Sequence, residues 1–270
     1  MKLHTVPASR GAQWVLLGLR AFASRPMLYT SLIGMWMLLA IVVQLIPLLG
    51  TILMWAALPL VTLGFMLTTQ QVLQGGPPSL QVFVQPLRGD PRRRRTLWQL
   101  GAIYAVVMAV VIGVFALIVG NDVVMPTPPP AGSNAPPPTL DPRLQNGLLW
   151  IAATTVLLSV PFWYAPALVH WGGHSAGQAL FSSVVAVWRN KGAFVMYALT
   201  NAAAVIVVAL AASLLVAMIG VASQQTAFAL LVPIAFVMMA IFYASLYFTY
   251  ADCFGPPGAE PPTLPEEPAA

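Results

Sequence analysis

Charged side chains are scarce in this sequence. Asp, Glu, Lys and Arg make up 7% of its 270 residues, whereas about a quarter is usual in soluble domains. So few charges cannot cover the surface of a water-soluble globule. Hydrophobic residues make up 59% instead, and they lie in long runs near the roughly 20 residues that a membrane-spanning helix needs. The composition predicts an all-α integral membrane protein that crosses the membrane several times.

The residue patterns of catalytic and metal sites are also missing. The single Cys253 excludes a disulfide within the chain and a site built from several thiolates. His170 and His174 have the four-residue spacing of helical metal ligands, but Gly172 and Gly173 separate them and no Cys, Asp or Glu is near. No phosphate-binding glycine loop, nucleophile elbow or catalytic triad appears. We expect no enzyme activity, no metal and no cofactor.

Six hydrophobic runs without charged residues predict six spanning helices, arranged as three helical hairpins within one membrane domain, residues 1–252. The runs cover residues 27–46, 48–70, 97–120, 147–171, 193–220 and 226–250. Two segments have a different composition: residues 121–145 are proline-rich and residues 253–270 are rich in proline and glutamate. Because neither can bury a core, we expect residues 121–145 to form an extended periplasmic loop and residues 253–270 to form a disordered cytoplasmic tail.

Three shorter segments carry apolar residues at helical spacing, and each ends in an apolar residue followed by arginine. Their apolar positions are Val15, Leu19 and Phe22; Leu80, Phe83, Val84 and Leu87; and Leu180, Phe181, Val184, Val185 and Trp188. This spacing predicts short amphipathic helices at the membrane interface. For the first segment, a ragged start of the first span is the alternative. Since a hairpin follows each segment, we predict three parallel repeats near residues 13–74, 79–171 and 176–252.

Lysine and arginine lie almost entirely on one predicted side of the membrane. That side holds Lys2, Arg10, Arg20, Arg25, Arg88, Arg92, Arg93, Arg94, Arg95, Arg189 and Lys191, and only Arg143 lies on the other. The positive-inside rule then places both termini and the amphipathic segments in the cytoplasm. Topology therefore explains the excess of 12 basic over 7 acidic residues, and we expect no nucleic-acid partner.

The cytoplasmic cations are the candidate functional residues. We predict that anionic lipid headgroups bind a ring formed by Arg20, Arg25, Arg88, Arg92, Arg93, Arg94, Arg95, Arg189 and Lys191. The protein would then be a structural or assembly component of the membrane, bound to lipid or to a membrane-protein partner that the sequence does not identify. The other explanation is that these side chains only set the topology during insertion.

A second function remains open, a permease or channel for a neutral or amphiphilic small molecule. Its candidate cavity residues are Pro161, Trp163 and Tyr164, because a proline-broken helix can expose backbone carbonyls to a cavity, and Asn201, the lone asparagine within a predicted span. Ordinary packing of a kinked helix is the alternative explanation for these residues. The spans contain no Asp, Glu, Lys or Arg, which argues against ion-coupled transport.

Two long segments resemble a known family. These are FMLTTQQVLQGGPPSLQVFVQPLR and FWYAPALVHWGGHSAGQALFSSVVAVWRNKGAF, and the N-terminal MKLHTVPASRGAQWV adds a third. Together they resemble the matching segments of an uncharacterised family of proteobacterial multi-pass inner-membrane proteins. The resemblance covers nearly the whole chain except the proline-rich loop and the tail. It implies a bacterial inner membrane and six helices, and it implies no activity because the family has none assigned.

Overall fold

The computed structural model describes residues 2–76, 80–120, 141–218 and 224–257, and every regular element within these ranges is helical. Six helical segments are long and apolar enough to span a membrane. They are α2 (Pro26–Gln44), α3 (Leu49–Leu73), α5 (Pro91–Val119), α6 with α7 (Pro142–Phe162 and Ala165–Gly172), α9 (Lys191–Met218) and α10 (Gln224–Phe254). The prediction of an all-helical membrane protein with six spans is confirmed.

Several helices extend beyond the predicted spans. Helix α5 begins at Pro91 rather than at residue 97, because the Asp90 side chain accepts a hydrogen bond from the Arg92 backbone N–H and caps the helix. Asp141 caps α6 in the same way, so the last residues of the predicted proline-rich loop are helical. Most of that loop, residues 121–140, and most of the predicted tail, residues 258–270, lie outside the described ranges.

The fourth span is broken in the middle of its sequence. Helix α6 ends at Phe162, and α7 begins at Ala165 with Pro166 in its first turn, where a missing N–H is tolerated. Helix α7 ends at Gly172, and the next residue, Gly173, has a φ of 65°, in the left-handed region that glycine adopts readily. There the Gly173 N–H donates a hydrogen bond to the Val169 carbonyl, and the His174 N–H donates one to the Leu168 carbonyl. His174 therefore lies outside the helix that carries His170.

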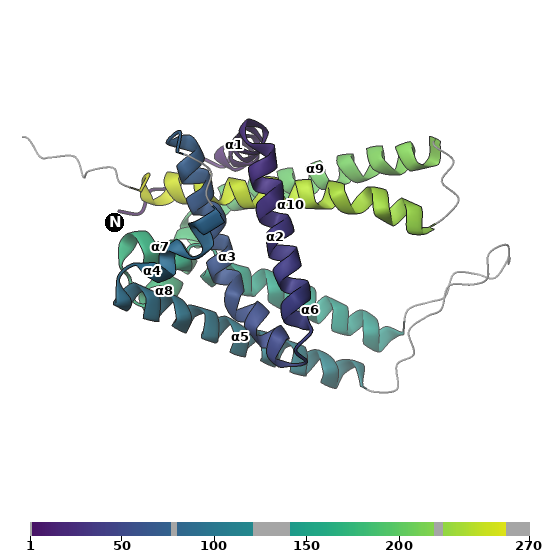
Figure 1. The fold of residues 1–270 in the computed structure, drawn as a ribbon, viewed down its shortest axis with the longest axis horizontal. Helices are drawn as coiled ribbons and strands as arrows, with labels where there is room; N and C mark the ends of the chain where they lie inside the picture. The colour runs from purple at the N-terminus through teal and green to yellow at the C-terminus, as the bar shows by residue number, and fades with distance from the viewer. Residues whose placement is uncertain (1, 77–79, 121–140, 219–223, 258–270) are drawn as a thin grey trace, which may run out of the picture.

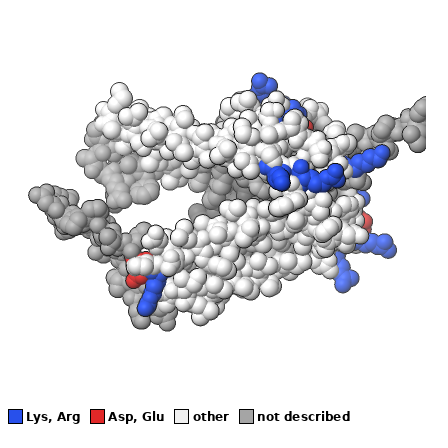
Figure 2. All heavy atoms as spheres, turned by 180° about the vertical axis from the view of Figure 1, so that it is seen from behind, with Lys and Arg blue, Asp and Glu red and all other residues white. Residues whose placement is uncertain are grey.

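Figure 1 shows two hairpins, α5–α6 and α9–α10, that are joined at the left by α7 and α8 (Ala176–Arg189) and separated at the right. The α2–α3 hairpin runs across both. The buried core lies where α3, α7 and α10 meet, and it includes Phe65, Leu168 and Tyr250. Figure 2, a space-filling view from behind, shows a deep opening between the two separated arms. We call this the inter-hairpin opening.

The first and third amphipathic segments are single helices, α1 (Arg10–Ser24) and α8, as predicted. Arg25 leaves the helical conformation between α1 and α2, so α1 is not a ragged start of the first span. The middle segment differs: it forms a 3-10 helix, Leu80–Phe83, and a short α4, Gln85–Arg88. The break has a physical cause, since Pro86 lacks an N–H and fits only the first turn of a helix. The threefold repeat of these units stays a prediction.

Helix α1 packs along α9 and α10 with its smallest residues at the contact. A side chain at Gly11 would collide with the backbone of Ala193, and one at Gly18 would collide with Ser245. Trp14 lies between these glycines, fully buried, with its ring edge-on to neighbouring aromatic rings of α9. Of the three apolar positions predicted to lie in the membrane interface, Val15 is buried against the protein, Phe22 is partly buried and Leu19 is 45% exposed. The interfacial placement of α1 stays a prediction.

Candidate functional site

Among the described residues, the most exposed aromatic side chains outside the spans lie on α8. Its small residues, Ala179, Ser183 and Ala186, are buried against the protein. Phe181 and Trp188 point outward and are 70% and 71% exposed. The predicted apolar stripe of α8 is therefore largely the outer face of the helix rather than its packed face.

Cations adjoin this α8 face directly. Arg189 ends α8, and Lys191 begins α9 with its ammonium 5.3 Å from the centre of the Trp188 ring, a cation–π contact. Both cations are exposed. We call Phe181, Val184, Trp188, Arg189 and Lys191 the α8 face. It combines large apolar side chains with positive charge on one outward surface.

Four consecutive arginines, Arg92–Arg95, form the first turns of α5, and all four are exposed. The N-terminus of a helix carries a partial positive charge, so these side chains add to an already positive site. Arg93 donates a hydrogen bond of 2.9 Å to the His170 carbonyl at the end of α7, where a cation is favourable. Trp98, one turn further along α5, is 51% exposed.

Few carboxylates are available to neutralise these cations. Within the described ranges the acidic residues are Asp90, Asp141 and Asp252, and two of them cap helices. The one ion pair among described residues joins Arg10 to Asp252. Every predicted headgroup-binding residue is exposed, and none of them pairs with a carboxylate of the described chain. Anionic groups of other molecules would therefore have to neutralise the positive charge of this surface.

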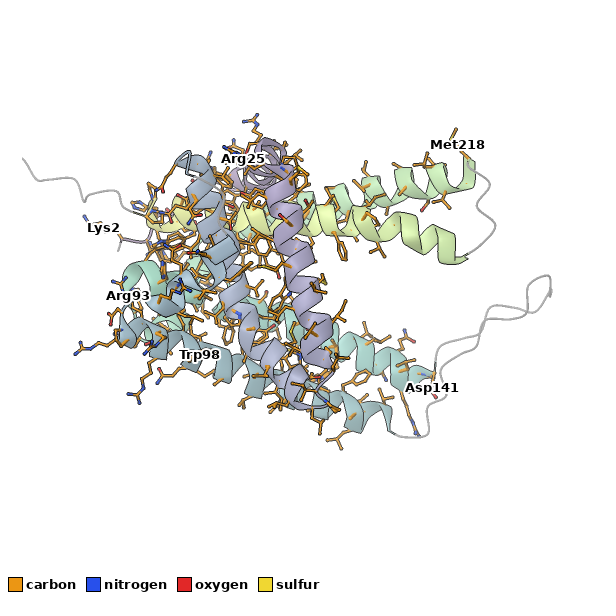
Figure 3. The ribbon with its side chains drawn as sticks, in the orientation of Figure 1. Lys2, Arg25, Arg93, Trp98, Asp141 and Met218 are labelled. Carbon is orange, nitrogen blue, oxygen red and sulfur yellow. The ribbon has the colours of Figure 1, made fainter. Side chains whose placement is uncertain are left out.

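The cations gather toward one end of the molecule. Figure 2 shows the Lys and Arg side chains mostly at the right, where the two arms join. In Figure 3, Lys2 and Arg93 lie near this end, which we call the cationic end, and Asp141 and Met218 lie at the opposite end. Arg25 lies apart from Arg93, along the side that α1 covers. The cations thus occupy several surfaces, and their predicted closure into one ring stays a prediction.

The four candidate cavity residues do not line one cavity. Trp163 borders a cavity of about 290 Å³ between α3, α5, α6 and α10. Asn201 borders a separate apolar groove of about 570 Å³ formed by α1, α9 and α10. Tyr164 is fully buried and donates a hydrogen bond of 3.0 Å to the Thr249 carbonyl. Pro161 lies in the last turn of α6 and borders neither cavity.

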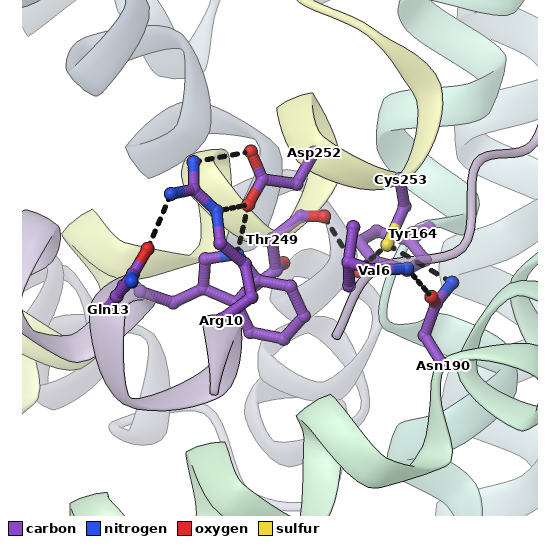
Figure 4. Close-up of polar contacts among 9 residues, drawn as sticks. Val6, Arg10, Gln13, Tyr164, Asn190, Thr249, Asp252 and Cys253 are labelled. Carbon is purple, nitrogen blue, oxygen red and sulfur yellow. Dashed lines mark hydrogen bonds and ion pairs between the residues drawn. The ribbon is translucent and has the colours of Figure 1, made fainter. Parts of the chain in front are cut away.

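A polar cluster near the cationic end was not anticipated from the sequence, and Figure 4 shows it. The Asn190 side chain accepts a hydrogen bond of 2.8 Å from the Val6 backbone N–H and donates one of 3.1 Å to the His4 carbonyl. It also contacts the buried Cys253 sulfur at 3.5 Å. The cluster joins the N-terminal segment to the α8–α9 junction and to the end of α10. In the sequence, its one signal was an asparagine between Arg189 and Lys191.

The histidines are placed separately. His174 is half-buried just after α7, and its Nδ1 is buried with no hydrogen-bond partner among the described residues. Burial lowers the pKa of His174 from its usual value. The described residues contain no group of three His, Cys, Asp or Glu side chains that could hold a metal ion.

Comparison with known proteins identifies a relative over the full length of the chain. A protein from Burkholderia thailandensis named "Probable inner membrane protein" is 32% identical over 271 residues, which cover 98% of each chain. No family model matches the chain. No solved structure matches it either.

Proposed function

The chain belongs to the same family of inner-membrane proteins as its Burkholderia thailandensis relative, and on that premise we propose that its cationic end binds anionic phospholipid headgroups. In this proposal the cationic end faces the cytoplasm, as the positive-inside rule predicts. The protein acts as a structural or assembly component of the membrane, with no catalytic step of its own.

The α8 face is the observation that carries this proposal. A helix with large apolar side chains on its outer face and cations beside them is suited to the boundary between headgroups and acyl chains. Phe181 and Trp188 would enter the acyl boundary, while Arg189 and Lys191 would contact headgroup phosphates. Exposed tryptophans are typical of this interface, and Trp98 on α5 adds a second one.

The arginines that begin α5 strengthen the attraction. A basic side chain near an anionic leaflet contributes about 1 kcal/mol, so Arg92–Arg95 together would contribute roughly 4 kcal/mol before screening by salt. Anionic headgroups would also offset the repulsion between these four side chains and the positive end of the helix. An acidic surface of a membrane-protein partner could supply the same charges, and the lipid experiment separates the two.

The test replaces Arg92–Arg95 with glutamine and measures the lipid that remains bound in mild detergent. The quadruple variant should insert with unchanged topology, because Arg88, Arg189 and Lys191 remain. It should retain several times less phosphatidylglycerol and cardiolipin than the wild type does. Arg143→Gln, at the opposite end, is the matched control and should retain the wild-type amount. Unchanged retention in the quadruple variant would leave these arginines as topology determinants alone.

The permease alternative has one observation in its favour, the cavity that Trp163 borders between the three hairpins. Transport would need that cavity to open in turn to each side of the membrane. The molecule that binds in this cavity would then be the transported substrate.

A further inference from the structure

The cavity between the hairpins is lined by side chains from all three of them. Its walls come from α3, α5, α6 and α10, and its volume is about 290 Å³. It lies near the point where the two arms of Figure 1 are joined, since Trp163 at the end of α6 donates a hydrogen bond of 3.2 Å to Thr249 of α10. Beyond this contact the arms separate into the inter-hairpin opening.

Two tyrosines of the cavity wall lie at similar distances along their helices from charged residues near the cationic end. Tyr104 follows Arg95 by nine residues along α5, and Tyr243 precedes Asp252 by nine residues along α10. At about 1.5 Å per residue, each lies about 13.5 Å from the charged end of its helix. Half of a hydrocarbon core is about 15 Å. With the cationic end at the membrane surface, as the proposed function has it, both phenols are close to the middle of the hydrocarbon core, where water is scarce.

Neither phenol has a hydrogen-bond partner among the described residues, although packing fixes both rings. The Tyr104 ring meets Phe162 edge-on at 4.9 Å, and the Tyr243 ring stacks on Phe65 at 4.7 Å. Both side chains are only partly buried, so their hydroxyls remain accessible from the cavity. In hydrocarbon, an unpaired hydroxyl costs free energy that a bound acceptor would recover.

Other polar groups of the cavity wall can accept hydrogen bonds from a ligand. Thr62 and Ser159 donate their hydroxyl protons to carbonyls of their own helices, which leaves oxygen lone pairs free to accept. Thr155 lines the same cavity and has no hydrogen-bond partner within the described chain. Among the described residues, no charged side chain lines the cavity. An ionic ligand would therefore be buried without a counter-charge, which is unfavourable.

We propose that this cavity binds the polar end of an uncharged amphiphile with ester or ketone carbonyls, the chemistry of a diacylglycerol. The Tyr104 and Tyr243 hydroxyls donate to its carbonyl oxygens, and Thr62 and Ser159 accept from its hydroxyl. The volume of about 290 Å³ is at the lower limit of small-molecule sites, about 300–1,000 Å³. It accommodates a glycerol ester group while the acyl chains extend into the inter-hairpin opening among the surrounding lipids.

The experiment uses the whole protein in lipid nanodiscs and a dioleoylglycerol analogue with a photoreactive diazirine close to one ester. After irradiation, mass spectrometry of the peptides locates the crosslinks. We expect them on the parts of α5, α6 and α10 that line the cavity. The double variant Tyr104→Phe/Tyr243→Phe keeps both rings, and its labelling should be roughly tenfold lower than that of the wild type. The single Tyr104→Phe variant should lose a smaller part of it.

Tyr247→Phe is the matched control, because Tyr247 lies on α10 one turn from Tyr243 and does not line the cavity. It should label like the wild type. A phosphatidylglycerol analogue with the same diazirine should label the cavity weakly. Equal labelling of the double variant and the control, as expected for a cavity that holds only water, would overturn the proposal. So would equal labelling by both lipids. Neither result bears on the cationic end, which the glutamine variants test separately.

Discussion

Arg10 and Asp252, 242 residues apart in sequence, form an ion pair that joins the first helix to the last. Figure 4 shows the hydrogen bonds between the Arg10 guanidinium and the Asp252 carboxylate. The Trp14 indole N–H donates a hydrogen bond of 2.6 Å to the same carboxylate. The two charged side chains are 37% and 19% exposed. This contact, with the close packing at Gly11 and Gly18, holds α1 on the protein and leaves α8 as the amphipathic helix with an uncovered aromatic face.

Asp252→Asn should destabilise the protein by about 1–2 kcal/mol, after allowance for solvent screening of a partly exposed pair. The change removes the charge that faces Arg10 and weakens the acceptor of the Trp14 indole. Thermal unfolding in detergent should show a lower Tm. Asp141→Asn is the matched control, because asparagine caps a helix about as well as aspartate does. An equal Tm for both variants would show that the ion pair contributes nothing measurable.

Gly11→Ala should destabilise the protein by about 1–3 kcal/mol, since the added methyl group must displace the backbone of α9. Gly34→Ala is the paired control. Nothing lies within 4 Å of a methyl group added at that position of α2, so alanine should be neutral or stabilising by about 0.5–1 kcal/mol. The stability of the two variants can be compared by measuring the SDS mole fraction at which each one unfolds. Similar stability for both would contradict the packing of α1 described above.

His174 should make stability fall in mild acid. Burial lowers its pKa in the folded state below the usual value of 6.5, so the unfolded chain takes up a proton first as pH falls. Stability is therefore full above about pH 7 and declines until the pH reaches the lowered pKa. Measured between about pH 7.5 and about pH 5.5, His174→Gln should show a smaller fall in Tm than the wild type. His4→Gln is the control, and an unchanged fall in the His174 variant would contradict the prediction.

Hydropathy and helix periodicity were sufficient to predict six spans and two of the three amphipathic helices. Periodicity alone could not say which face of α8 packs inward: the stripe containing Phe181 and Trp188 is exposed because Ala179, Ser183 and Ala186 allow a closer approach to the protein. The break before Pro86 was visible in the sequence as a proline. The regular spacing of the apolar residues on both sides concealed its effect.

The site residues depend on contacts that one sequence does not encode locally. Trp163 and Asn201 were both predicted to line a cavity, yet they border different cavities. Tyr104 and Tyr243 were not singled out, because a tyrosine in an apolar run has no periodic signal. Only the crossing of α5 and α10 with their neighbours places both rings at one cavity. The available clue was that Tyr104 and Tyr243 are separated from Arg95 and Asp252, respectively, by the same number of residues.

The predicted orientation can be tested with two single-cysteine variants in a background that lacks Cys253. Gly89→Cys lies just before α5 at the cationic end, and Gln145→Cys lies in the first turns of α6 at the opposite end. A membrane-impermeant maleimide added to spheroplasts should label position 145 and leave position 89 unlabelled until the membrane is opened. Labelling of position 89 from outside would reverse the topology.

The most direct test of lipid binding is the composition of the lipid that leaves the membrane with the protein. Wild-type protein would be placed in nanodiscs with equal amounts of phosphatidylglycerol and phosphatidylethanolamine, and native mass spectrometry would count both lipids on the released protein. We predict several-fold enrichment of phosphatidylglycerol, decreasing at high salt because exposed cations are screened and abolished when Arg92–Arg95, Arg189 and Lys191 are glutamine. Equal numbers of the two lipids, unaffected by salt, would contradict the proposal that the cationic end binds anionic headgroups.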